Sequence, residues 1–265
     1  LDLVALGTVA DVVPLDTNNR ILTWQGLSRI RAGKCRPGIK ALLEIANRDP
    51  LKLAASDLGF ALGPRLNAAG RLDDMSVGVA LLLCDNIGEA RVLASELDAL
   101  NQTRKEIEQG MQAEALTLCE KLERSGDNLP GGLAMYHPEW HQGVVGILAS
   151  RIKERFHRPV IAFAPAGDGT LKGSGRSIQG LHMRDALERL DTLHPNLMIK
   201  FGGHAMAAGL SLEEAKFDEF QRLFGELVTE WIDPSLLQGE VVSDGELSPA
   251  EMTMEVAQML RDAGP

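Results

Sequence analysis

The chain has 265 residues and a formal net charge of −10; 45% of its residues are hydrophobic and 24% are charged. This composition is typical of a globular protein, and the length favours two domains. The longest apolar run, residues 77–84, is far too short to cross a bilayer, which excludes a membrane-spanning protein. No secretion signal opens the chain, and three widely spaced cysteines are typical of reduced thiols in a cytoplasmic protein. Because residue 1 is a leucine in a strand-like stretch, we expect an internal part of a longer protein.

The negative charge is unevenly distributed along the chain. Residues 210–265 hold 13 acidic and three basic residues, whereas residues 1–209 hold 24 of each sign. Runs of basic residues in the neutral part are most often solvated helix faces. The acidic net charge therefore does not exclude local positive surface that could meet a nucleic acid.

The first half of the chain is predicted to be largely helical. Residues 1–6 form an apolar run that predicts a strand. Asp11 follows where α/β sheets place ligand-binding side chains, although a turn or cap aspartate fits equally well. The glycine-rich stretch 125–132 ends the last helix and predicts a domain boundary. Asparagine, proline and serine signals predict helices over 18–32, 37–46, 76–84 and 87–124, the last one capped by Asn86.

Residues 63–72 crowd charged and small residues around a proline. Pro64 predicts an interruption of the helical pattern. Arg65, Asn67 and Arg71 then lie close together, and the guanidinium fork suits phosphate oxygens. The plainer interpretation is a helix corner whose arginines pair with the aspartates that follow residue 72.

The second half alternates strands and helices, which predicts a small α/β domain with a mixed sheet. The tail, residues 239–265, predicts a short strand and a helix over about 251–260. Period-two and period-3.6 patterns predict strands over 133–136, 159–163, 171–176, 197–201 and 207–212, and helices over 143–156, 183–190 and 213–231.

Two glycine-rich stretches of this half carry side chains that bind anions. They are residues 172–177, Lys-Gly-Ser-Gly-Arg-Ser, and residues 200–210, Lys-Phe-Gly-Gly-His-Ala-Met-Ala-Ala-Gly-Leu. Glycine lets a phosphate lie against backbone N–H groups, because no Cβ stands in the way. Either stretch alone is most often a tight turn. The two together predict a site for a phosphate and its nucleotide, formed by Ser174, Arg176, Gly202, Gly203 and His204.

The loop before the predicted 143–156 helix is a further candidate. His137 and His141 have the spacing of a zinc pair, but Pro138 separates them and no HExxH motif is present, so we do not expect zinc. The ring of His141 and the N–H groups at Gly143, where the helix starts, suit an anion instead. The dinucleotide fingerprint, the P-loop and the serine nucleophile elbow are absent from the sequence.

Five motifs in order resemble one family. They are Gly-Thr-Val-Ala-Asp, Leu-Gly-Pro-Arg-Leu-Asn-Ala-Ala-Gly-Arg-Leu, Trp-His-Gln-Gly-Val-Val-Gly-Ile, Gly-Ser-Gly-Arg-Ser and Gly-Gly-His-Ala-Met-Ala-Ala-Gly. The resemblance covers the whole chain and is to the DHH phosphoesterase superfamily, in its branch of single-strand-specific 5′→3′ DNA exonucleases. It implies an α/β fold in four parts: the end of the DHH catalytic domain (1–50), a helical connector (51–125), a DHHA1 domain with a mixed sheet (126–231) and the start of an oligonucleotide-binding barrel (232–265).

The resemblance also implies roles for the candidate residues. Asp11 matches an acidic ligand of a two-ion Mn²⁺ or Mg²⁺ centre. Ser174 and Arg176 would hold the 5′-terminal phosphate, assisted by Arg71 and Arg65. Gly202, Gly203 and His204 would lie along the strand near the scissile phosphate, which makes His204 a catalytic candidate beside Asp11.

One departure from the family pattern limits this chain. The Asp-x-Asp and Asp-His-His motifs that supply the other metal ligands are absent. The resemblance implies that the parent protein is an exonuclease of DNA repair and recombination. Because one carboxylate cannot hold two ions, we expect this chain alone to be inactive. The resemblance implies single-strand-binding protein and a RecQ-type helicase as partners.

Two alternatives stay open. One is a DHH-family phosphodiesterase for short oligonucleotides or cyclic dinucleotides; the predicted 87–124 helix and the tail weigh against it. The other is a non-catalytic nucleic-acid-binding replication scaffold that has lost its metal site; the retained Asp11 weighs against that.

Overall fold

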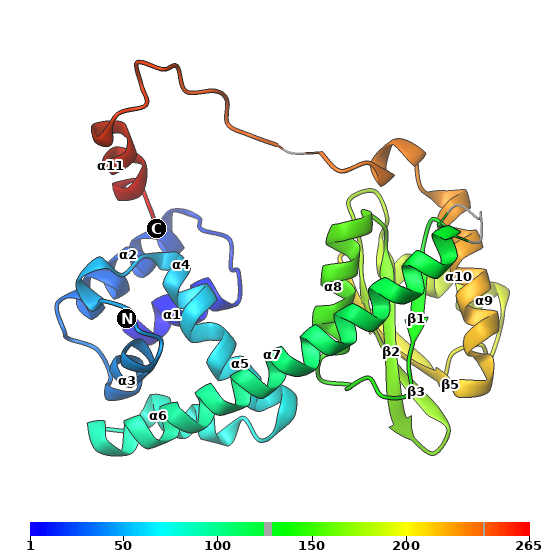
Figure 1. The fold of residues 1–265 in the computed structure, drawn as a ribbon, viewed down its shortest axis with the longest axis horizontal. Helices are drawn as coiled ribbons and strands as arrows, with labels where there is room; N and C mark the ends of the chain where they lie inside the picture. The colour runs from blue at the N-terminus through cyan, green and yellow to red at the C-terminus, as the bar shows by residue number, and fades with distance from the viewer. Residues whose placement is uncertain (125–128, 241) are drawn as a thin grey trace. The chain divides into compact units, whose positions relative to one another are not determined.

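The structure is a computed structural model that describes residues 1–124, 129–240 and 242–265 (Figure 1). The chain separates into two compact units. The first unit is Leu1–Arg104 together with Ser243–Pro265, and the second unit is Lys105–Val242. Among the described residues, every helix is too short or too polar to cross a bilayer.

The first unit is helical throughout its described elements. Its helices are α1 (Asp2–Ala10), α2 (Thr17–Arg31), α3 (Pro37–Ile45), α4 (Ala55–Asp57), α5 (Gly63–Leu72), α6 (Ser76–Leu83) and α11 (Met254–Asp262), with a 3-10 turn at Pro50–Lys52 and a π-helical segment at Leu58–Leu62. The long helix α7 (Ile87–Arg124) begins in the first unit and ends in the second. The oxygen of the Asn86 side chain accepts hydrogen bonds from the N–H groups of Gly88 and Glu89, which confirms the predicted cap of α7.

The predicted strand over residues 1–6 is wrong, because these residues belong to α1. A short apolar run does not distinguish a buried strand from a buried helix by its pattern. Here Ala5 and Leu6 are buried in a core shared with α2, and Gly26 allows the two helices to approach: a Cβ on Gly26 would lie 2.4 Å from the Cβ of Ala5. Asp11 therefore follows a helix and not a strand.

The predicted break at Pro64 is also wrong. Helical backbone continues from Ala55 to Leu72 through α4, the π-helical segment and α5. Pro64 is the second residue of α5 and follows directly on the π-helical segment, where the N–H of Gly63 donates to the carbonyl of Leu58, five residues back. The proline therefore changes the type of helix and does not end it.

The second unit is built on one five-stranded sheet with the order β1-β2-β3-β5-β4. β1 and β2 are parallel and the other pairs are antiparallel, which confirms the predicted mixed sheet. Its elements are β1 (Leu133–Tyr136), α8 (Val145–Phe156), β2 (Val160–Gly167), β3 (Thr170–Arg176), α9 (Met183–Leu193), β4 (Lys200–Gly203), β5 (Ala207–Glu213) and α10 (Phe217–Trp231), with 3-10 turns at Glu214–Lys216 and Pro234–Leu237.

Helices cover the two faces of this sheet unequally. One face packs on α9 and α10 around a core that includes Phe163, Leu210, Phe220 and Phe224. The other face is covered by α8, which packs on β2 and β3 (Figure 1). The β5 and β4 side of that second face is consequently available for a ligand.

Two loop and tail predictions have different outcomes. The predicted boundary stretch, residues 125–132, lies partly outside the described residues, since 125–128 are not described. In the tail, α11 confirms the predicted helix, whereas the described residues of 239–265 contain no strand. A strand there would need a neighbouring strand to pair with, and the local sequence pattern does not reveal whether one is present.

Candidate nucleic-acid interface

The side chains of β3 alternate between the two faces of the sheet. Gly173 points into the core, where a Cβ would lie 2.5 Å from the ring of Phe163. Because neighbouring residues of a strand point to opposite faces, Lys172, Ser174 and Arg176 lie on the α8 face. The predicted phosphate ligands Ser174 and Arg176 therefore share a face with each other.

The register of β3, β5 and β4 places glycines beside Ser174. Ser174 pairs with Gly209, which in turn pairs with Gly202 on β4. A Cβ on Gly202 would meet nothing within 4 Å, and one on Gly209 would meet only the Gly173 carbonyl at 3.9 Å. These glycines form the open floor of a shallow groove of about 430 Å³. The groove is lined by Gln142, Val145, Lys172, Gly173, Ser174, Lys200, Phe201, Gly202, Gly209, Leu210 and Ser211, so no acidic side chain lines it in the described part of the chain.

Ser174 and Arg176 are already joined on the folded chain. Arg176 Nη1 donates hydrogen bonds to Ser174 Oγ at 3.0 Å and to the Gly175 carbonyl at 2.8 Å. The first turn of α8 lies directly over them, since a Cβ on Gly146 would be 2.9 Å from Arg176 Nη2 and 3.0 Å from Ser174 Oγ. The hydroxyl, the guanidinium and the amino end of a helix thus meet at one point, which is an arrangement suited to an anion.

The turn between β4 and β5 requires its second glycine. Gly203 has a φ of +149°, and a Cβ there would lie 2.4 Å from the Ala207 carbonyl oxygen. His204 closes the turn, because its N–H donates to the same oxygen at 2.8 Å. The exposed His204 ring accepts a hydrogen bond at Nδ1 from the Met206 N–H at 3.3 Å. His204 lies past the end of β4 and does not line the groove.

The loop before α8 lies beside the groove. The ring of the half-buried His141 accepts a hydrogen bond at Nδ1 from the Gly143 N–H at 3.1 Å, so His141 orders its own loop. Between them, Gln142 lines the groove and accepts a hydrogen bond from Lys172 Nζ at 3.3 Å. His137 is near Glu114, with Nδ1 at 3.8 Å from the carboxylate, and is not paired with His141.

The remaining predicted residues belong to the first unit. Arg65 donates to the carboxylate of Asp98 on α7 at 2.7 Å and to the Ala61 carbonyl at 2.6 Å. The arginine therefore does not pair with the aspartates after residue 72, which corrects the plainer interpretation for this residue. Asn67 is exposed and Arg71 is half-buried on the same helix.

This chain does not by itself supply the ligands of the two-ion metal centre that the resemblance implies. Asp11 is an exposed residue at the end of α1. In the ranges that the structure describes, no group of three or more His, Cys, Asp or Glu side chains could hold a metal ion. Because a pair of hard cations needs several oxygen ligands, the residues present do not fit the centre by themselves.

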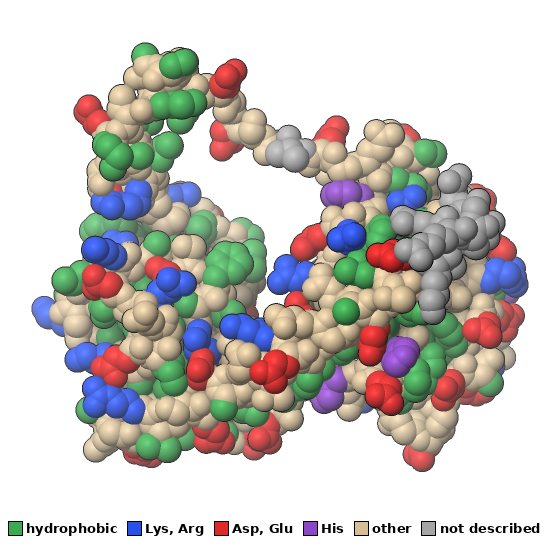
Figure 2. Space-filling view, in the orientation of Figure 1, with side chains coloured by type: hydrophobic (Ala, Val, Ile, Leu, Met, Phe, Trp, Pro, Cys, Tyr) green, Lys and Arg blue, Asp and Glu red, His purple; other side chains and the backbone are tan. Residues whose placement is uncertain are grey.

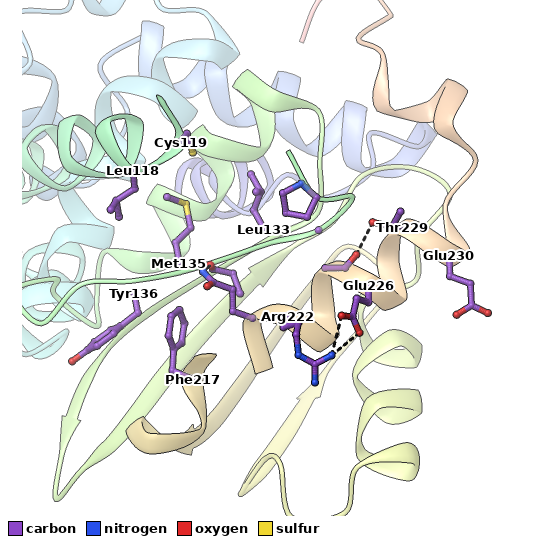
Figure 3. Close-up of a pocket in the computed structure, with 15 residues that line it drawn as sticks. Leu118, Cys119, Leu133, Met135, Tyr136, Phe217, Arg222, Glu226, Thr229 and Glu230 are labelled. Carbon is purple, nitrogen blue, oxygen red and sulfur yellow. Dashed lines mark hydrogen bonds and ion pairs between the residues drawn. The ribbon is translucent and has the colours of Figure 1, made fainter. Parts of the chain in front are cut away.

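A second, larger hollow of about 1020 Å³ lies at the other edge of the sheet, between β1, α10 and the end of α7 (Figure 3). Its walls include Leu118, Leu133, Met135 and Phe217. On its α10 side, Arg222 forms an exposed ion pair with Glu226 at 2.9 Å. On the face drawn in Figure 2, acidic and basic side chains are mixed over both units, and charge alone marks no site there.

Comparisons with known proteins agree with this architecture. The model of the DHHA1 domain matches residues 130–230. Over 265 residues the chain is 92% identical to the single-stranded-DNA-specific exonuclease RecJ of Escherichia coli (strain K12). The chain belongs to the RecJ family. It covers 46% of that relative, and so spans about half of its length.

More distant RecJ proteins support the same assignment. The chain is 36% identical over 228 residues to RecJ of Bacillus subtilis (strain 168), covering 86% of this chain and 28% of that protein. The crystal structure of RecJ from Thermus thermophilus in complex with Mg²⁺ matches with a TM-score of 0.75 at 36% identity, covering 88% of this chain and 35% of that chain. This likeness confirms the predicted α/β fold with a DHHA1 domain.

Several groove residues were not singled out from the sequence. Lys172 and Lys200 stood at the edges of the two glycine-rich stretches, and Ser211 lay just outside one of them. Gly146 belonged to a quoted motif, but nothing in its local pattern indicated contact with Arg176. The available signal was the lysine that opens each glycine-rich stretch.

Proposed function

We propose that the chain is part of a divalent-metal-dependent exonuclease that hydrolyses single-stranded DNA 5′→3′ to mononucleotides in DNA repair and recombination. The E. coli and B. subtilis relatives carry the name single-stranded-DNA-specific exonuclease, and two crystal structures of T. thermophilus RecJ contain Mg²⁺ or Mn²⁺. The observation that carries the proposal for this chain is the groove beside Ser174 and Arg176. Its floor is glycine and its described lining contains no acidic residue, in a chain of net charge −10.

The terminal 5′-phosphate is assigned to Ser174 and Arg176. The Arg176 guanidinium would donate to two phosphate oxygens, and the Ser174 hydroxyl to a third. Their mutual hydrogen bond holds both groups in position before the ligand arrives, which lowers the entropy cost of binding. Hydrogen bonds to charged groups contribute about 1.5–3 kcal/mol, which corresponds to roughly a tenfold or greater preference for a phosphorylated end.

The other predicted residues have supporting roles in this proposal. Gly202, Gly203 and His204 would follow the strand toward the scissile phosphate, and the loop of His141 and Gly143 would border it. Arg65, Asn67 and Arg71 would contact DNA from the helical connector. Asp11 would supply one carboxylate to the metal centre, whose other ligands this chain lacks; the chain alone is therefore proposed to be inactive.

Partners and location follow from the same proposal. We propose that the parent enzyme acts on single-stranded DNA together with single-strand-binding protein and a RecQ-type helicase. A cytoplasmic location agrees with the three cysteines, Cys35, Cys84 and Cys119, none of which forms a disulfide in the described part of the chain.

The test is binding of the chain to single-stranded DNA with a 5′-phosphate and to the same DNA with a 5′-hydroxyl. Fluorescence anisotropy over a salt series separates the end-specific contribution from the general attraction of the DNA backbone. We expect several-fold tighter binding to the phosphorylated end, and loss of this preference in Arg176→Ala. Arg176→Lys should retain only part of it, because an ammonium lacks the guanidinium fork.

Arg189→Ala is the matched control. Arg189 is exposed on α9, which covers the opposite face of the sheet, so this variant makes the same change in net charge away from the groove. Equal binding of the two ends by the unmodified chain, or an equal loss in Arg176→Ala and Arg189→Ala, would contradict the assignment.

A further inference from the structure

Trp140 belongs to one of the five sequence motifs but has no role in the proposed function. It is only 3% exposed, and its indole Nε1 donates a hydrogen bond of 2.8 Å to the carboxylate of Glu114 on α7. A buried indole N–H needs an acceptor, and a hydrogen bond to an ionised carboxylate is stronger than one to a neutral group. This contact therefore ties the loop that contains Trp140 to the long helix α7.

The tied loop leads directly into α8. The residue that begins this helix, Val144, makes no side-chain cap hydrogen bond. Instead, the carbonyl of His141 accepts hydrogen bonds from the N–H groups of Val144 at 2.9 Å and of Val145 at 3.2 Å. A helix without a side-chain cap depends on the preceding turn to satisfy its first N–H groups. Displacement of the loop at Trp140 would consequently displace the first turn of α8.

That first turn lies against both proposed ligands of the 5′-phosphate. Gly146 is the second residue of α8, and a Cβ there would lie 2.9 Å from Arg176 Nη2 and 3.0 Å from Ser174 Oγ. The helix backbone is therefore in close contact with the guanidinium and the hydroxyl. Movement of this turn would alter the position of both groups, although neither Trp140 nor Glu114 touches them.

A second contact holds the body of α8 to α7. Further along α8, Arg151 Nε donates a hydrogen bond of 3.1 Å to Glu108 Oε1. This ion pair does not involve the loop before the helix. Loss of the hydrogen bond between Trp140 and Glu114 should therefore loosen the start of α8 while the rest of the helix stays attached.

We propose that Trp140 and Glu114 are a positioning pair that holds the first turn of α8 over Ser174 and Arg176. The inference rests on the proposed function, because it takes Ser174 and Arg176 as the anchor of the 5′-phosphate. The pair contacts no DNA itself. It acts by keeping the backbone at Gly146, and with it the guanidinium, in the arrangement that receives the phosphate.

The experiment measures the preference of the 265-residue chain for single-stranded DNA with a 5′-phosphate over the same DNA with a 5′-hydroxyl, by fluorescence anisotropy. We expect Glu114→Ala and Trp140→Phe to lower this preference several-fold, because each removes one partner of the hydrogen bond. Glu114→Gln should restore most of it, since an amide oxygen also accepts from the indole. The ratio of the two affinities cancels any general effect of the lost negative charge.

Matched controls are available in the same unit. Glu188→Ala removes an exposed carboxylate from α9, and Trp231→Phe changes a tryptophan that is 43% exposed at the end of α10. Both controls should keep the full preference. An equal decrease in Glu188→Ala and Glu114→Ala would refute the positioning role.

Two further readouts separate positioning from a merely structural role. In an Arg176→Ala background, Glu114→Ala should have no additional effect on the preference, because the pair acts through the guanidinium. Amide hydrogen exchange in the first turn of α8 should be faster in Glu114→Ala than in the unmodified chain. A lower melting temperature with unchanged preference and unchanged exchange at this turn would overturn the proposal.

Failure of this inference is distinguishable from failure of the proposed function. If the unmodified chain prefers the 5′-phosphate and folded Glu114→Ala keeps that preference in full, the positioning pair is refuted and the anchor stands. If the unmodified chain shows no preference, the anchor fails and the positioning role fails with it. The Glu114 side chain is 46% exposed, so its replacement tests the proposal even if Trp140→Phe does not fold.

Discussion

The two hollows of the second unit lie at opposite edges of one sheet and differ in most physical properties. The hollow at β1 is the larger, at about 1020 Å³ against about 430 Å³, but its walls are mainly apolar and its arginine is already paired with a glutamate. The groove on β3, β5 and β4 is shallow, floored by glycine and lined by two lysines without an acid among the described residues. For an anionic ligand the chemistry of the lining therefore matters more than the volume, since an apolar wall offers no replacement for the water that a phosphate loses.

The first prediction tests whether the walls of the β1 hollow contribute to the stability of the fold and not to DNA binding. Phe217 contacts Tyr136 and Phe163 with ring centroids 5.4 Å and 5.6 Å apart. Phe217→Ala should lower the free energy of unfolding by about 2 kcal/mol, less than for a fully buried phenylalanine, because its ring is only partly buried. Urea denaturation measures this loss. Affinity for single-stranded DNA under native conditions should not change, and a parallel loss of affinity would refute the contrast between the two hollows.

The second prediction fills the floor of the groove. Gly209→Val places a branched side chain where a Cβ meets nothing closer than 3.9 Å, so the fold should tolerate it, and valine suits a strand. The affinity for single-stranded DNA should fall about tenfold, which is about 1.4 kcal/mol. Anisotropy titration provides the measurement, and Gly209→Ala should give an intermediate value. Normal binding by a folded Gly209→Val chain would mean that DNA does not lie on this floor.

The third prediction displaces the proposed anchor of the 5′-phosphate. A Cβ at position 146 would lie 2.9 Å from Arg176 Nη2, and the flexible arginine would have to move. Gly146→Ala should therefore reduce the preference for a 5′-phosphate over a 5′-hydroxyl by about threefold, or roughly 0.6 kcal/mol. Helix stability should not suffer, because alanine is the better helix former. An unchanged preference would show that phosphate binds the guanidinium in a different position from the one in this structure.

The fourth prediction concerns a titration at Tyr136, at the rim of the β1 hollow, and no change in DNA binding; Tyr136 is the single tyrosine of the chain. Burial, together with a hydrogen bond of 2.8 Å to Glu214, raises the pKa of Tyr136 to about 12. Tyrosinate absorbance of the folded chain should therefore appear about two pH units later than in urea, where the pKa is about 10. The stability contributed by the neutral phenol is present below the unfolded pKa and is lost as pH rises from about 10 to about 12. Glu214→Gln should lower the folded-state midpoint, and coincident folded and unfolded titrations would contradict this environment.

Local signals in the sequence were sufficient for much of the fold. The Asn86 cap of α7, the proline that opens α3 and the alternation of strands and helices after residue 132 depend on residues a few positions apart, and all were predicted. Local signals failed where packing against a distant part of the chain determines the secondary structure. The apolar run of α1 fits a strand or a helix equally well until Gly26 of α2 packs against it, and the π-helical turn before Pro64 has no short-range signature.

The residue types of the candidate site are evident in the chain itself: glycines beside a hydroxyl, a guanidinium and lysines in two short stretches. Which of them share a surface depends on tertiary structure. Strand order placed β5 between β3 and β4, so that Lys172 and Lys200 flank Ser211, and packing of α8 brought Gly146 over Arg176. The physical reason is that pairing register is set by burying the opposite face of the sheet, where Gly173 and Leu210 meet Phe163, and a shift of one residue would turn every groove side chain into the core.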